Sequence, residues 1–209
     1  MNTEKRDFDK EAASWDENPG RVRIAKDVAR AILRQVALTH DMDIMDFGCG
    51  TGLLSIELQL LVHSVTGIDS SQGMLDIFNS KISGMGLKNV GTLLVDLEKG
   101  DRLTGSYDLV VSSMTVHHIR EIESLFDQFN DATVPDGHLY IADLDPDDGL
   151  FHSDNTGVFH FGFDRNNFRK VFIKAGFNNV RDVKAAEIMK PVGNGETRRF
   201  TLFLMTGRK

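Results

Sequence analysis

The segment spanning residues 43–52 constrains the fold more than any other part of this chain. It opens with an apolar run typical of a buried strand and closes with three glycines, Gly48, Gly50 and Gly52. Apolar residues then recur at near-helical spacing over 53–61. Glycine lets the backbone approach a ligand, and a helix N-terminus leaves N–H groups free. The segment therefore predicts the first half of a nucleotide-binding unit.

Two acids and one leucine indicate which ligand this unit suits. Dinucleotide sites follow the pattern G-x-G-x-x-G, but Leu53 stands where the third glycine is required. Asp46 precedes the first glycine by two residues, where a carboxylate would repel a diphosphate and suit a ligand carrying an ammonium and a sulfonium. A second short strand ends at Asp69, where an acid can hold ribose hydroxyls. A purely structural glycine turn and a NAD-type site are the alternatives.

The run DFGCGTG at 46–52 resembles the first motif of the class I S-adenosylmethionine-dependent methyltransferases. Asp69 falls where the ribose-binding acid of that family ends the second strand. The resemblance covers most of the chain and points to the small-molecule branch (methyltransferase type 11/12), which includes ubiquinone and menaquinone biosynthesis enzymes. It implies S-adenosyl-L-methionine as cofactor, S-adenosyl-L-homocysteine as product and a small-molecule methyl acceptor. Nitrogen, oxygen and carbon acceptors all stay open.

The resemblance also assigns binding residues. It implies that Asp96 binds the adenine amino group and that the N–H of Leu97 meets a ring nitrogen, although Asp96 could instead be a surface acid capping a turn. Trp15 either packs on the domain or helps to roof the pocket, and the family favours the second. Cys49 is expected to be a small buried side chain beside the cofactor rather than a nucleophile. The full set expected at the cofactor is Asp46, Gly48, Cys49, Gly50, Asp69, Ser70, Met74, Asp96, Leu97, Ser112 and Trp15.

The remaining periodicity predicts an alternation of helices and strands. Helices are expected over about 21–37, from a cap within 70–72 to the glycines at 84 and 86, over 121–133 and after the cap at Asp164. Strands are expected at 90–95, 107–113 and 138–144. Two final strands near 178–189 and 197–206 flank the turn signal at 194–195 and should pair antiparallel. The prediction is an α/β, Rossmann-like, doubly wound and mostly parallel seven-stranded sheet, with a C-terminal antiparallel hairpin and helices on both faces.

The length of 209 residues fits a single methyltransferase domain, 1–209. Residues 1–37 would form an N-terminal cap and helix, with a mobile start, and 145–162 a lid or insertion over the acceptor site. His152 and His160 in this loop are expected at the surface. The phenylalanines of the loop could line an apolar acceptor pocket or form a packed edge; they are Phe151, Phe159, Phe161 and Phe163.

His117 and His118 are the candidate catalytic residues, because they follow the fourth strand and an imidazole titrates near neutrality. A general base is needed only if the acceptor must lose a proton, so one histidine could simply pack while the other meets water. No metal site is predicted. The acidic residues after residue 142 are spaced somewhat like the ligands of an EF-hand loop, but the pattern does not match. Pro146 interrupts it, and Gly149 stands one residue later than the glycine of an EF-hand. The histidines show no metal-ligand spacing beyond the adjacent pair.

Composition narrows the partners. A net charge of −7 argues against nucleic-acid binding, and no Asn/Asp-Pro-Pro-Tyr/Phe run follows the fourth strand. The single cysteine, Cys49, excludes an internal disulfide. No signal peptide or membrane-spanning run is recognisable, so a cytoplasmic location is expected; the oligomeric state is not predicted. Two alternative functions remain: a non-catalytic regulatory protein that binds the cofactor or its product, and a protein or nucleic-acid methyltransferase.

Overall fold

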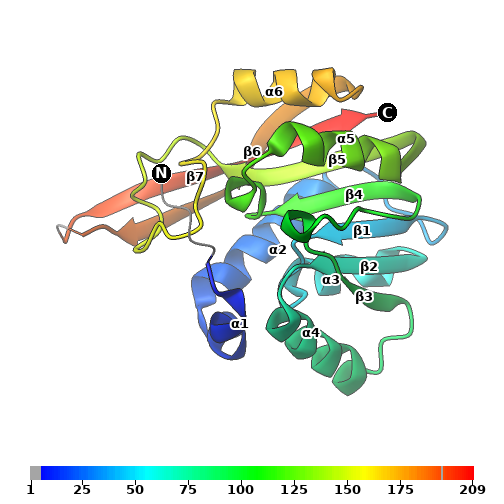
Figure 1. The fold of residues 1–209 in the computed structure, drawn as a ribbon, viewed down its shortest axis with the longest axis horizontal. Coiled ribbons are helices and arrows are strands. Elements are labelled where there is room, and N and C mark those ends of the chain that lie inside the picture. Colours follow the sequence, from blue (N-terminus) through cyan, green and yellow to red (C-terminus); the bar gives the residue numbers. More distant parts are fainter. Residues whose placement is uncertain (1–5, 194) are drawn as a thin grey trace.

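A single seven-stranded sheet organises the chain in the computed structural model, which describes residues 6–193 and 195–209 (Figure 1). The strand order is β3-β2-β1-β4-β5-β7-β6. Neighbours among β1 to β5 are parallel, whereas β7 is antiparallel to both β5 and β6. The strands are β1 (Asp43–Phe47), β2 (Ser64–Asp69), β3 (Val90–Leu94), β4 (Tyr107–Ser113), β5 (Thr133–Leu144), β6 (Asn178–Pro191) and β7 (Thr197–Arg208). This arrangement confirms the predicted Rossmann-like fold.

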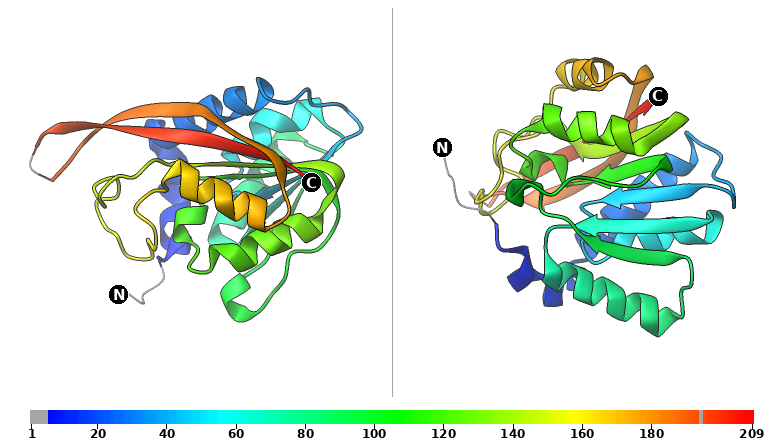
Figure 2. Two further views of the ribbon diagram at one scale, coloured as in Figure 1. Left: turned by 90° about the horizontal axis from the view of Figure 1, so that it is seen from above. Right: turned by 45° about the vertical axis from the view of Figure 1, so that its right-hand side comes forward.

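Helices cover both faces of the sheet (Figures 1 and 2). The α-helices are α1 (Phe8–Glu11), α2 (Pro19–Leu33), α3 (Leu53–Leu58), α4 (Gln72–Met85), α5 (Ile122–Ala132) and α6 (Arg165–Lys174). Short 3-10 helices are η1 (Ala12–Glu17), η2 (Gln59–Leu61), η3 (Leu97–Lys99) and η4 (Val116–His118). Within the described residues, no helix combines the length and the apolar character needed to cross a bilayer.

Strand alternation divides the core into two apolar clusters. Ile44 and Val111 face α2 and α3, whereas their neighbours Met45 and Val110 face α5 and α6. All four side chains are fully buried. A strand that is buried on both faces reads as a continuous apolar run, which is why β1 and β4 were recognisable in the sequence.

Side-chain caps set several helix boundaries. The Ser71 hydroxyl accepts the N–H of Met74 at the start of α4, and the Asp164 carboxylate accepts that of Asn167 at the start of α6. Both caps were predicted. Helix α2 begins at Pro19, earlier than the predicted residue 21, because Asn18 caps it and proline suits the first helical position. The predicted mobile start and hairpin turn fall partly outside the described residues, which exclude 1–5 and 194.

The strand order reverses direction beside β1, which places a crevice at the carboxyl ends of the parallel strands. The chain runs from β1 outward to β3, and then returns to lay β4 on the other side of β1. The N-terminal helix α1 and the long connection from β5 to α6 lie on the same side of the molecule, at the left of Figure 1. Segments from distant parts of the chain therefore meet over this crevice.

The turn from β1 to α3 depends on Gly52, which has a left-handed backbone (φ 80°). A Cβ atom at this position would lie 2.1 Å from the ring of Phe78 in α4. We expect Gly52→Ala to lower the free energy of unfolding by about 3 kcal/mol or more, since backbone strain and overpacking add. Gly84→Ala is the matched control, because a Cβ there meets no atom within 4 Å and the residue lies in a helix. In urea denaturation, the free energy of unfolding of the control should rise by up to about 1 kcal/mol. An equal loss of this free energy in both variants would contradict the packing argument.

Candidate active site

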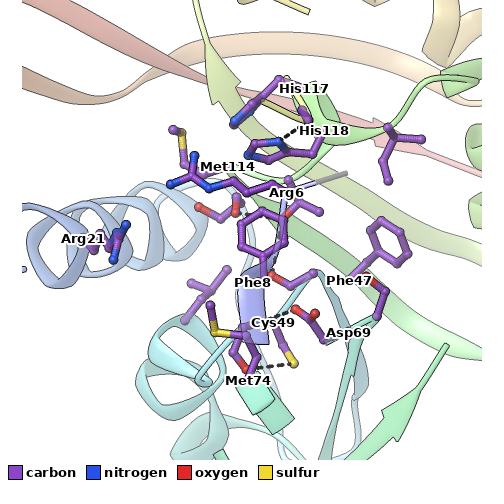
Figure 3. A pocket seen from close by; sticks show the side chains of 18 of the residues that line it. Arg6, Phe8, Arg21, Phe47, Cys49, Asp69, Met74, Met114, His117 and His118 are labelled. Carbon is purple, nitrogen blue, oxygen red and sulfur yellow. Dashed lines mark hydrogen bonds between the residues drawn. The ribbon is translucent and has the colours of Figure 1, made fainter. Parts of the chain in front are cut away.

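One cavity of about 1220 Å³ occupies the crevice at the carboxyl edge of the sheet (Figure 3). Its floor is the glycine turn after β1, together with the ends of β2, β3 and β4. The N-terminal segment contributes Phe8 and Trp15, and the β5–α6 connection contributes Phe151 and Phe159. The volume exceeds the roughly 300–1,000 Å³ of common small-molecule pockets, so the cavity has room for two ligands side by side.

Asp69 holds the glycine turn in place. One of its carboxylate oxygens accepts the N–H of Gly50 at 2.8 Å, and the other accepts the N–H of Ser71 at 2.9 Å. The N–H groups of Gly48 and Cys49 donate to the carbonyl of Ile68 at 2.7 and 3.0 Å. Burial raises the pKa of Asp69, and the backbone donors partly oppose that rise. The ends of β1 and β2 are thereby tied into one rigid floor.

Asp46 lies beneath the same turn and is almost fully buried. The hydroxyl of Ser55 donates to its carboxylate at 2.6 Å. Burial raises the pKa of Asp46 to about 6, against the opposing effect of the Ser55 hydrogen bond. Burial also raises the pKa of the Cys49 thiol well above its usual value, so this thiol is neutral near neutral pH and is a poor nucleophile.

Asp96 is a buried acid at the end of the next strand rather than an exposed one. Its carboxylate accepts the N–H of Glu98 at 3.2 Å and lies 3.5 Å from the ammonium of Lys99. Its own N–H donates to Asp101 at 2.9 Å, which fixes the turn into η3. Asp96 and Leu97 both line the cavity.

The N-terminal segment is fastened across the start of α4. The carboxylate of Asp9 accepts the hydroxyl of Ser71 at 2.5 Å and the N–H of Gly73 at 2.8 Å. Trp15 faces the cavity, and the guanidinium of Arg21 stacks 3.6 Å from its ring centroid. Residues 12–17 form a 3-10 helix, and these tertiary contacts hold the segment in place.

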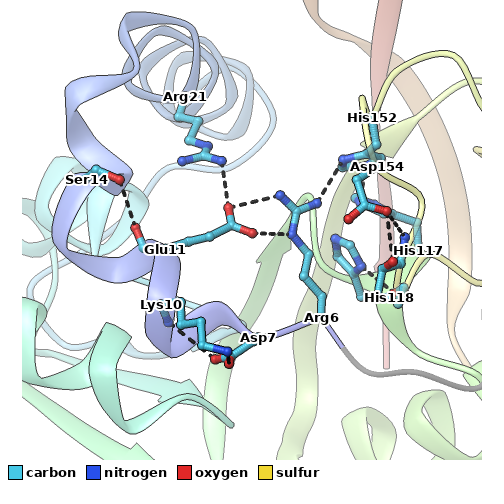
Figure 4. Close-up of polar contacts among 12 residues, drawn as sticks. Arg6, Asp7, Lys10, Glu11, Ser14, Arg21, His117, His118, His152 and Asp154 are labelled. Atoms are coloured by element: carbon cyan, nitrogen blue, oxygen red, sulfur yellow. Dashed lines mark hydrogen bonds and ion pairs between the residues drawn. The ribbon is translucent and has the colours of Figure 1, made fainter.

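Three histidines form a cluster at the end of the cavity away from Asp69 and Cys49 (Figures 3 and 4). His117 contacts Asp143 through Nδ1 at 2.7 Å, and both side chains are completely buried. The Nε2 atoms of His117 and His152 lie 3.1 Å apart. His118 Nδ1 lies 2.7 Å from the carbonyl of Gly157, and Arg6 Nη1 lies 3.3 Å from His152 Nδ1.

The partners of these rings define which nitrogens carry hydrogen. A carboxylate and a carbonyl can only accept, so the Nδ1–H groups of His117 and His118 donate to them. A guanidinium can only donate, so His152 Nδ1 accepts from Arg6 and His152 Nε2–H donates to His117. Burial lowers the pKa of His118 to about 3 and that of His152 to about 2, with the neighbouring His117 as the next cause. Both imidazoles are therefore neutral at physiological pH.

The profile of the methyltransferase domain family matches residues 21–182, most of the chain. This chain is a member of that family. The family predicted from the sequence is thereby confirmed.

Relatives agree with this assignment. The methyltransferase is 27% identical to the uncharacterized methyltransferase C1347.09 of Schizosaccharomyces pombe, over 93% of this chain and 85% of that protein. It is 28% identical to a ubiquinone biosynthesis O-methyltransferase of Marinobacter nauticus, over 48% of this chain and 43% of that enzyme. Its fold is similar to that of a Haloferax volcanii putative methyltransferase solved in complex with the activator Trm112, with a TM-score of 0.77 and 18% identity, covering 97% and 98% of the two chains.

The cavity of this methyltransferase brings together the residues expected at the cofactor, with one exception. Ser112 does not line the cavity, whereas Ser113 does. The side chains of successive residues in a strand point to opposite faces of the sheet. An error of one position in the prediction therefore selects Ser112 in place of Ser113. The buried hydroxyl of Ser112 has no hydrogen-bond partner among the described residues.

Of the histidines and phenylalanines between residues 151 and 163, some line the cavity and others do not. His152, expected at the surface, is half-buried and faces the cavity; His160 is also half-buried but lies outside it, near the carbonyl of Ile119. Phe151 and Phe159 line the cavity, whereas Phe163 is buried in the core and Phe161 is exposed. The sequence missed Arg6 and His152 as partners because 146 residues separate them.

The raised pKa of Asp46 predicts a pH-dependent stability. The folded state binds the proton with a pKa of about 6, against the ordinary aspartate value of 3.8. Protonated Asp46 therefore stabilises the folded state relative to the unfolded state. This stabilisation is fully present below about pH 4 and is lost as the pH rises through 6. Asp46→Asn cannot ionise and keeps an acceptor for Ser55. From pH 4 to 7 the cofactor-free variant should gain about 2–3 kcal/mol relative to wild type in urea denaturation. A difference between the two proteins that stays constant over this range would contradict the assignment.

Proposed function

We propose that this protein transfers the methyl group of S-adenosyl-L-methionine to a small-molecule acceptor, with S-adenosyl-L-homocysteine as the second product. One observation carries the proposal. A single cavity joins the glycine turn and its acids, at one end, to the aromatic side chains and histidines at the other. Methyl transfer from a sulfonium is an in-line displacement, so a cofactor pocket that continues into an acceptor pocket is the arrangement that the reaction requires.

The cofactor would occupy the end of the cavity that contains Asp46, Asp69 and Asp96. We assign Asp46 to the ammonium and sulfonium side of the cofactor, since a buried carboxylate attracts cations strongly in a low dielectric. Asp69 would accept the ribose hydroxyls, and Asp96 with the N–H of Leu97 would hold the adenine. Gly50 lines the cavity and has a left-handed backbone (φ 53°). A Cβ at this position would lie 3.9 Å from Sδ of Met74 and 4.0 Å from Nε1 of Trp15, two other residues of the cavity wall. Glycine therefore suits a close approach of the cofactor to the backbone here.

The acceptor would occupy the end that Phe151, Phe159 and His118 line. Two aromatic rings and a neutral imidazole suit a compact organic molecule with an apolar body and a polar reacting atom. The likeness to a ubiquinone biosynthesis O-methyltransferase supports an acceptor of this kind. Since the leaving group is a neutral thioether, much of the rate would come from positioning of the acceptor.

Asp69→Ala should weaken binding of S-adenosyl-L-methionine by about 1.5–3 kcal/mol, because charge-assisted hydrogen bonds to a diol would be lost. Titration calorimetry on the purified protein measures this change. Asp43→Ala is the control: Asp43 begins β1, at the opposite end of the strand from the cavity, and contacts Ser64 and His63. Unchanged affinity in Asp69→Ala, or tight binding of NAD by the wild type, would overturn the cofactor assignment.

The class of acceptor is tested with cofactor that carries a labelled methyl group. A cell extract is separated into small molecules, protein and nucleic acid, and each fraction is incubated with the purified enzyme. We expect label to enter the small-molecule fraction. Label that enters only protein or nucleic acid would refute the proposed acceptor, and tight cofactor binding without any turnover would favour the regulatory alternative.

A variant of His118 links this turnover to the cavity. His118→Ala should lower kcat by about 10²-fold or more while cofactor affinity stays the same, because the histidine lies at the acceptor end. His160→Ala is the matched control, since His160 is half-buried like His118 but does not line the cavity. Equal turnover by wild type and His118→Ala would remove this histidine from the reaction.

A further inference from the structure

Three imidazoles converge at the acceptor end of the cavity from two separate segments of the chain. His117 and His118 belong to η4 after β4, and His152 comes from the β5–α6 connection. One nitrogen from each ring lies within 4.8 Å of the others. We propose that His117, His118 and His152 form a binding site for a divalent transition-metal ion such as Zn²⁺. Metal binding itself does not depend on the function proposed above, whereas any role of the ion toward a methyl acceptor does.

The hydrogen bonds around the cluster prepare two rings for coordination. His117 donates Nδ1–H to Asp143 and His118 donates Nδ1–H to the carbonyl of Gly157, so neither Nε2 atom carries a hydrogen. Histidines that bind metals in proteins almost always donate their other N–H to a carboxylate or a backbone carbonyl. Asp143 is completely buried and also accepts the N–H groups of His117 and Leu144, which fixes its orientation.

The spacing of the rings fits a common metal ion. Bonds of about 2.0–2.1 Å at tetrahedral angles would separate two ligand nitrogens by roughly 3.3 Å. The Nε2 atoms of His117 and His152 are already 3.1 Å apart. The ring centroids are 4.2 Å apart for His117–His118, 5.1 Å for His117–His152 and 5.5 Å for His118–His152, so the three rings form one compact cluster. Three imidazole nitrogens leave a fourth position, and all three residues line the cavity.

The neighbouring charges permit a cation. Asp143 supplies a negative charge directly behind His117. Arg6 and Lys190 are the opposing groups. Glu11 pairs with Arg6 through two hydrogen bonds of 2.6 and 2.9 Å, and the ammonium of Lys190 donates to the carbonyl of Phe151. Coordination through Nε2 of His152 would move its ring hydrogen to Nδ1 and replace the contact with Arg6, which is long at 3.3 Å. The exchange therefore costs this contact and the hydrogen bond between His152 and His117, while Arg6 keeps its carboxylate partner.

The sequence did not predict this site, because two adjacent histidines alone are not a ligand spacing. His152 lies 35 residues from His117, in a segment without helix or strand. Without metal, the cluster is already connected by polar contacts that run from Arg6 through His152 and His117 to Asp143. Imidazole ligands suit Zn²⁺, Ni²⁺, Cu²⁺ and Fe²⁺, whereas Mg²⁺ and Ca²⁺ prefer oxygen.

The test uses the full chain without a polyhistidine tag, stripped of metal with a chelator. Titration calorimetry with Zn²⁺ should show about one ion bound per chain with a micromolar or lower Kd, and Co²⁺ should give the intense visible absorption of a four-coordinate site. His152→Ala should weaken Zn²⁺ binding by about 100-fold or more, since one of three ligands is lost. Asp143→Asn should weaken it by about 10–100-fold through the orientation of His117.

His160→Ala provides the control and should bind Zn²⁺ as wild type does, because His160 lies outside the cluster. Circular dichroism and thermal melting of each stripped variant separate loss of a ligand from loss of folding. Wild-type protein without stoichiometric binding, or equal affinity in wild type and His152→Ala, would overturn the proposal. Neither result depends on turnover, so the metal site and the methyl-transfer function are tested separately.

Discussion

The two hydrogen bonds that Asp69 accepts hold together the part of the structure on which the cavity depends. One joins its carboxylate to the N–H of Gly50, in the turn after β1, and the other to the N–H of Ser71, at the start of α4. Helix α4 in turn packs Phe78 against Gly52 so closely that no side chain fits there. The turn, the end of β2 and α4 therefore constrain one another, and none of them can shift without moving the floor of the site.

The sequence predicted those parts of the fold and site that follow from local pattern. Asp69 and Asp96 each follow a short apolar strand, and a parallel sheet brings the carboxyl ends of its strands to one edge. Position along the chain was therefore enough to place both acids at the cavity. Ser112 shows the limit of the same reasoning, because the identity of the side chain that faces a ligand changes with every single residue of a strand.

The contacts over the cavity were beyond sequence reasoning for a different reason. Arg6 and His152 meet across 146 residues, and neither belongs to a helix or strand whose periodicity could orient it. Asp9 likewise fastens the N-terminal segment by bonding to Ser71 and Gly73 at the start of α4. These contacts depend on how two irregular segments fold over the sheet, and irregular segments carry no repeating pattern from which such a path can be derived.

Carboxyl groups lie at the ends of four of the five parallel strands, and each is compensated differently. The compensating groups are the Ser55 hydroxyl for Asp46, two backbone N–H groups for Asp69, the Glu98 N–H and Lys99 ammonium for Asp96, and His117 for Asp143. Burying a carboxyl group costs free energy even when it is paired, and the apolar clusters on both faces stabilise the sheet without these groups. The first three line the cavity, and the fourth orients a histidine that does. The free-energy cost of burying carboxyl groups is thus concentrated along one edge of the sheet. Such a concentration of destabilising groups is expected at a functional site rather than in a purely structural core.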